Sequence, residues 1–183
     1  MVVTLAAAVL AAVVFVGIRS SRHGPSSSGG GDSGLDSGPA YRVVERPDLG
    51  FAVELPPNWS ESPDDPGLAS VLFARSASTQ SWFRVFRRDT PLGVPEVLDQ
   101  LTAGLSQQGG SGFSRQATVV GTLPAFRLDF KLPLLFGGAG PVSTQTYFVV
   151  KRDTTVYTLA LATIDPTNQG PALARIGSSF RLL

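Results

Sequence analysis

The sequence predicts an α+β domain in which helices cover a mainly antiparallel β-sheet. Segments with the period of a strand and segments with the period of a helix follow one another in the order strands, helix, strands, helix. The connections between successive strands are of hairpin length, which is typical of antiparallel neighbours. An uncharged segment at residues 2–18 and a tract rich in Ser and Gly come first, so we expect the domain over residues 41–183.

Three strands are expected before the first helix. In residues 51–55 large apolar side chains alternate with Ala52 and Glu54, and the two prolines that follow end the strand. The alternation in residues 71–75 and 82–88 predicts two more strands. Each of these strands is expected to bury one face.

Two helices are expected. Pro95 occupies the first-turn position that proline favours, and Gly109 and Gly110 end the helix that it opens. Apolar side chains at helical spacing form one face of this helix: Val94, Val97, Leu98, Leu101 and Leu105. The second helix is expected at about residues 169–179. Its sequence directs three apolar side chains to the sheet, namely Leu173, Ile176 and Phe180.

Four strands are expected between the helices. Residues 114–131 contain two of them, split by a turn at residues 121–124. Residues 142–151 and 155–164 predict a hairpin with Arg152 and Asp153 at its turn. The last strand carries small side chains on one face, which indicates close cover by a helix: Thr158, Ala160 and Ala162.

The N-terminal segment, residues 2–18, predicts a single-pass membrane anchor. As a helix its seventeen uncharged residues would span about 25 Å, close to a bilayer core of about 30 Å. No Lys or Arg precedes the segment and no Ala-x-Ala ends it, which favours an uncleaved anchor over a signal peptide. A cleaved signal and a buried soluble helix stay open as alternatives. We therefore expect a transmembrane helix at residues 1–18 and a disordered tether at residues 19–40.

The amino-acid composition limits the partners and the catalytic residues that the domain can have. The formal charge of +1 with interspersed signs gives no reason to expect a nucleic acid partner. There is no cysteine, and the single histidine, His23, lies in the tether, so Cys- and His-based catalysis is excluded from residues 41–183. No cofactor or metal site is predicted. Carboxylates remain, but Asp64 and Asp65 lie between prolines in an expected turn, and Asp129 is expected to pair with Arg127 or Lys131.

Residues 132–136, Leu-Pro-Leu-Leu-Phe, lack a simple structural explanation. They join two expected strands through a Gly-rich turn, whereas loop tips are usually polar because their backbone faces water. Two interpretations stay open. The segment is the end of a strand packed under the final helix, or Leu134, Leu135 and Phe136 are an exposed contact for a partner or the bilayer surface.

Three motifs resemble those of PsbP-like domains. They are FAVELPPNW at residues 51–59, GTLPAFR at residues 121–127 and IGSSFR at residues 176–181. The motifs occur in the order of that family, and the chain looks like the small LpqN-type envelope proteins of high-GC bacteria. Many of those proteins are lipoproteins. This chain has no cysteine to lipidate, so a protein anchor would replace the lipid.

The resemblance implies an α/β/α sandwich and a non-enzymatic accessory or protein-interaction module of the cell envelope, with another envelope protein as partner. It also implies an extracytoplasmic domain, although Arg19 and Arg22 after the anchor favour the cytoplasmic side. One alternative is a binding protein for an apolar ligand such as a lipid or cell-wall precursor, which predicts an apolar pocket of about 300 Å³ or more. Another is a carboxylate-dependent hydrolase, which predicts two acids facing a cleft.

Overall fold

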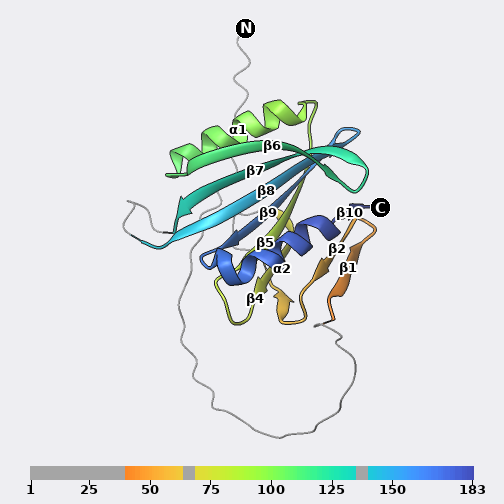
Figure 1. The fold of residues 1–183 in the computed structure, drawn as a ribbon. Helices are drawn as coiled ribbons and strands as arrows, with labels where there is room; N and C mark the ends of the chain where they lie inside the picture. The colour runs from red at the N-terminus through yellow and green to blue at the C-terminus, as the bar shows by residue number, and fades with distance from the viewer. Residues whose placement is uncertain (1–39, 64–68, 135–139) are drawn as a thin grey trace, which may run out of the picture.

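A seven-stranded antiparallel sheet is the centre of the computed structural model, which describes residues 40–63, 69–134 and 140–183 (Figure 1). Its strand order is β3–β4–β5–β9–β8–β7–β6. The strands are β3 (Trp59–Glu61), β4 (Ser70–Ser76), β5 (Trp82–Asp89), β6 (Ser111–Val120), β7 (Leu123–Pro133), β8 (Val142–Arg152) and β9 (Thr155–Thr163). The expected anchor and tether, Asp64 and Asp65 lie outside the described residues. Within those residues no helix is both long and apolar enough to span a bilayer.

A second, three-stranded sheet lies on one face of the large sheet (Figure 1). It consists of β1 (Arg42–Arg46), β2 (Phe51–Leu55) and β10 (Arg181–Leu182), with β2 in the middle. The helix α2 (Pro166–Ser179) packs against β2 and β9 on the same face, and α1 (Val94–Gln107) packs on the other face against β7 and β8. The expectation of an α+β fold with helices over a mainly antiparallel sheet is confirmed.

Each face of the large sheet has its own apolar core. On the α2 face Phe51 from β2, Phe83 from β5 and Ile176 from α2 are fully buried in one cluster. On the α1 face Val97 and Leu98 of the helix pack on side chains of β7, β8 and β9. The strand β9 is buried along both faces. Its larger side chains belong to the core on the α2 face and its smaller ones lie on the α1 face. Ala160 on the small face belongs to the same core cluster as α1, but the helix with the most contacts to β9 is α2, which lies on the face of the larger side chains.

Both helices begin and end for identifiable reasons. Pro95 lies in the first turn of α1, and Gly109 beyond its end has φ +88°, a conformation that glycine adopts without strain. The helix α2 begins at Pro166, three residues before the predicted start, because the Asp165 carboxylate accepts hydrogen bonds from the backbone and side-chain N–H groups of Asn168.

The N-cap of α2 carries a prediction. Replacing Asp165 by alanine removes the acceptor for the Asn168 N–H, so we expect the free energy of unfolding to fall by about 0.5–2 kcal/mol in a denaturant titration. Asp165→Asn is the matched control, since asparagine caps helices equally well and should stay close to wild type. Equal losses in both variants would contradict a capping role.

The structure differs from the sequence prediction at several short elements. The turn of the β8–β9 hairpin is Asp153–Thr154 rather than 152–153, since Arg152 pairs with Thr155 and Asp153 takes φ +56°. The strands β1, β3 and β10 were not predicted. These strands are short and carry charged residues on their exposed faces. They therefore show too few alternating apolar and polar residues to be predicted as β2 was.

Candidate functional site

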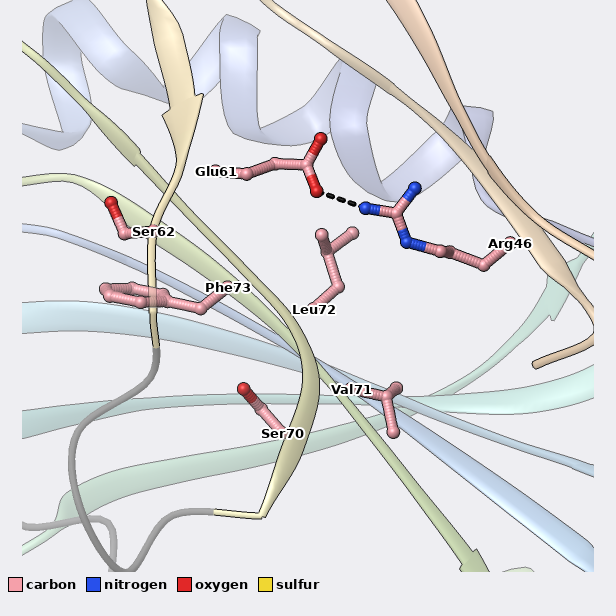
Figure 2. Close-up of a pocket in the computed structure, with 7 residues that line it drawn as sticks. All are labelled: Arg46, Glu61, Ser62, Ser70, Val71, Leu72 and Phe73. Carbon is pink, nitrogen blue, oxygen red and sulfur yellow. Dashed lines mark hydrogen bonds and ion pairs between the residues drawn. The ribbon is translucent and has the colours of Figure 1, made fainter. Parts of the chain in front are cut away.

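A small pocket lies between the small sheet and the β3–β4 edge of the large sheet (Figure 2). Its volume is about 150 Å³. The lining residues are Arg46, Glu61, Ser62, Ser70, Val71, Leu72 and Phe73. Figure 2 shows the Arg46 guanidinium and the Glu61 carboxylate pointing toward one another above Leu72, where they form an ion pair.

The ion pair is part of a connection between the two sheets. Glu61 on β3 also accepts a hydrogen bond from Arg42 on β1, at 3.3 Å between Nη1 and Oε1. All three side chains are partly exposed, and exposed pairs of this kind stabilise a fold by about 0–1 kcal/mol. This pocket has a charged rim and about half of the 300 Å³ that is the lower limit for typical ligand sites, so it does not match the apolar pocket expected for a lipid-like ligand.

A second cluster of polar groups lies within the α1 face of the large sheet. Arg84 on β5 is only 2% exposed, and its guanidinium lies 4.3 Å from the centre of the Phe73 ring and 4.9 Å from that of Trp82. A cation held against aromatic faces and shielded from water is stabilised by about 2 kcal/mol. The β5–β9–β8 register places Tyr147 in the same row as Arg84, with Ala160 between them.

Burial controls the chemistry of Tyr147. It raises the pKa of the phenol well above its ordinary value, and the nearby Arg84 charge lowers that pKa by a smaller amount. The phenol therefore stays protonated at physiological pH. Beside it Gln145, 1% exposed, donates to the Ser143 hydroxyl, which donates to the Leu132 carbonyl. These contacts hold β7 and β8 together below α1.

Sequence reasoning did not identify the Arg84 cluster. A charged residue in a strand is normally expected on the solvent-exposed face, so the sequence pattern alone predicts that Arg84 is exposed. The available signal was the neighbouring pair Trp82 and Phe86 on the same face, which indicates that Arg84 lies between buried aromatic groups. Both faces of β5 are in fact buried over residues 83–86.

The carboxylates of the described residues are mostly engaged in structural contacts. Asp129 lies 2.8 Å from the Arg127 guanidinium and accepts a hydrogen bond from the Thr146 hydroxyl, so its predicted pairing is with Arg127 rather than Lys131. The others with side-chain partners follow the same pattern: Glu45 with Arg181, Glu54 with Arg175, Glu61 with Arg42 and Arg46, Asp89 with Thr155, Asp99 with Arg115, and Asp165 with Asn168.

The residues of the apolar segment at the end of β7 differ in how deeply they are buried. Leu132 is 7% exposed and belongs to the core below α1, so this part of the strand end does not pack under the final helix as one interpretation had it. Leu134 is half-buried, and its N–H donates to the Pro141 carbonyl at 3.0 Å, which extends the β7–β8 pairing. Leu135 and Phe136 lie outside the described residues.

The three sequence motifs lie at junctions of the fold. Residues 51–59 form β2 and lead into β3, residues 121–127 turn from β6 into β7, and residues 176–181 end α2 and begin β10. The first and third motifs meet directly, because the rings of Phe51 and Phe180 stack with centroids 5.4 Å apart.

The chain matches no protein-family model and no curated protein sequence. Among solved structures it is similar to cyanobacterial PsbP (CyanoP) from Synechocystis sp. PCC 6803, with a TM-score of 0.62 and 14% identity over 84% of this chain and 98% of that chain. The domain has the PsbP-like fold. This confirms the fold that the three motifs implied.

Two further structures resemble this PsbP-like domain. A protein of Bacteroides thetaiotaomicron VPI-5482 has a TM-score of 0.55 and 11% identity, and the match covers 77% of this chain and 48% of that protein. LpqN of Mycobacterium tuberculosis, which is involved in cell envelope biogenesis, has a TM-score of 0.49 and 16% identity over 78% of this chain and 90% of LpqN.

Proposed function

We propose that this chain is a membrane-anchored, non-enzymatic module that holds a PsbP-like domain at the cell envelope and binds another envelope protein. The observation that carries the proposal is the joining of this fold to an uncharged segment at residues 2–18 through a Ser- and Gly-rich tract. A flexible tether of this length has a root-mean-square span of about 25 Å. That span is long enough for a domain to reach a neighbour in the same membrane.

The positions of the acidic residues support a non-enzymatic role. A carboxylate-dependent hydrolase places two acids across a cleft with unequal proton affinities. In the described pocket the single acid is Glu61, and two arginines already neutralise it. Asp129 is held by Arg127 and Thr146 on an exposed part of the sheet. These carboxylates join structural elements together.

The proposed partner contact is the tip formed by Leu134, Leu135 and Phe136. Leu132, two residues earlier, is buried in the core below α1. Leu134 directly follows β7, where its side chain is half-exposed. Apolar side chains at such a position lose contact with water when a partner covers them, which stabilises the complex.

The proposal places the domain on the extracytoplasmic side, and the experiment that tests location uses the full chain in its native membrane. We expect it to remain in the membrane after alkaline carbonate extraction, and deletion of residues 2–18 should release it. Protease added to intact spheroplasts should degrade the domain while a cytoplasmic marker survives. A domain that is protected until the cells are lysed would contradict the proposed side, and a full chain released by carbonate would contradict the anchor.

A further inference from the structure

The edge strands of the two sheets differ in how they are protected. Free strand edges pair readily with other chains, and proteins usually prevent this with charges or very short strands. Three of the five residues of β1 are charged, β3 has three residues and β10 has two. The edge strand β6 has ten residues, no proline and a single charge, Arg115.

The outer edge of β6 is available for pairing. Within the described residues β6 is the terminal strand of the large sheet, and β7 is its only neighbour (Figure 1). The helix α1 packs mainly on β7 and β8, one strand further in. A β-bulge beside Gly112 interrupts the pairing near the start of β6, and residues 114–120 then form a regular ladder with β7.

The side chains of β6 form one polar row and one mixed row. Ser114, Gln116 and Thr118 face the same side as α2; Ser114 and Gln116 are exposed, Thr118 is half-buried, and Val120 at the end of this row is buried in the core. On the α1 side Val119 is 67% exposed, the highest value among the large apolar side chains of the described residues. Phe113, at the other end of this row, is half-buried and stacks on Phe130.

The single charge of β6 is already neutralised. The Arg115 guanidinium lies 2.6 Å from Asp99 on α1 and donates to the Thr102 hydroxyl at 2.7 Å. These contacts direct the side chain toward α1, away from the free edge. The edge therefore lacks the charge that would repel a second strand.

We propose that β6 pairs with β6 of a second copy of this chain, antiparallel and with Gln116 on the two-fold axis. In this register Ser114 lies opposite Thr118 of the second copy, and Phe113 lies opposite Val119 of the second copy. Directly opposed residues of antiparallel strands contact one another, so polar groups meet polar groups and the exposed valine is covered by an aromatic ring. The two large sheets become one continuous sheet.

Neighbouring registers fit less well. A shift in one direction places Arg115 opposite Arg115 of the second copy, and like charges directly opposite are destabilising. A shift in the other direction places Val119 opposite Arg115, which leaves the valine without an apolar neighbour. In the proposed register Arg115 lies opposite the small Ala117, so its contacts with α1 are undisturbed. The strand is self-complementary in one register, which makes a second copy the partner that fits this edge.

Disulfide trapping tests the register, because the natural chain has no cysteine. In the full chain, solubilised in detergent, Gln116→Cys should form a covalent dimer on mild oxidation. Opposed Cα atoms in antiparallel pairs lie about 4.5–5.5 Å apart, within the range of a disulfide. Ser60→Cys is the matched control, since Ser60 is equally exposed on the opposite edge strand, β3. Two chains that merely share a micelle would trap at both positions equally, and that result would overturn the proposal.

A charge variant tests the same interface without a crosslink. Gln116→Lys places two ammonium groups opposite each other on the axis, whereas Gln116→Thr keeps a neutral strand former there. By light scattering in detergent we expect two copies for wild type and Gln116→Thr and one copy for Gln116→Lys. Because Gln116 is exposed, all three should fold, with the same circular-dichroism spectrum in the absence of denaturant. A single copy for wild type, or a crosslink from position 116 to a different protein in native membranes, would overturn the second copy as partner.

Discussion

Replacement of Phe51 by alanine is expected to lower the free energy of unfolding by about 3–5 kcal/mol. Phe51 is fully buried, its ring stacks on Phe180 and it meets the Tyr157 ring edge-on at 6.4 Å. One side chain thus joins the small sheet, the end of α2 and strand β9. Its removal leaves a cavity where three elements meet, which a denaturant titration followed by circular dichroism would measure.

The matched control for Phe51 is Val43→Ala on the adjacent strand of the small sheet. Val43 is 50% exposed, so its truncation should change the free energy of unfolding by no more than about 0.5 kcal/mol. If Phe51→Ala were as mild as Val43→Ala, the small sheet would not be part of the main core. That result would contradict the two-sided packing of the large sheet.

Replacing Leu134, Leu135 and Phe136 together by serine is expected to reduce recovery of the envelope partner by at least about tenfold. A few central apolar side chains carry most of the binding free energy of a typical protein interface. The midpoint of thermal unfolding should be unchanged, because the core position of this strand end belongs to Leu132. Chemical crosslinking in native membranes, followed by purification of the tagged chain, measures the recovery.

The control for the tip is Leu132→Ser. This change places a hydroxyl in the core below α1, so we expect a loss of about 2–5 kcal/mol in stability. The two variants separate a partner contact from a packing role. A large fall in the unfolding midpoint of the triple variant would show that residues 134–136 are core and would contradict the proposed contact.

The strands and helices that could be predicted are those in which buried apolar residues recur at the spacing of a strand or of a helix. The alternation in residues 51–55 and the apolar stripe beginning at Val94 each mark a buried face, and both elements are present as predicted, although Ala52 on the other face of β2 is buried as well. The strand β9 was also predictable, because its two faces carry side chains of different sizes. In each case packing selects the residues, so the pattern is visible in the sequence.

The features that were not predictable depend on contacts between distant residues. β1 forms because Val44 is buried against the core while its neighbours are solvated, and one buried position gives no period. Arg84 is buried because aromatic rings from two strands enclose it, a contact set by the β4–β5 register. At the candidate partner contact, Leu132 is buried because it lies in the core below α1, whereas Leu134 is only half-buried. This difference also depends on a contact between distant residues.

The proposed role of the domain is to contact another envelope protein through the end of β7 while residues 2–18 hold it in the membrane. Site-specific photocrosslinking in the native membrane tests it most directly, with a photoreactive phenylalanine analogue at position 134 and, as control, at the exposed Ser178 on α2. We expect one discrete adduct with another envelope protein from position 134, none from position 178, and loss of the adduct when residues 2–18 are deleted. The same adducts from both positions, or an adduct that persists without residues 2–18, would contradict the proposed anchored contact.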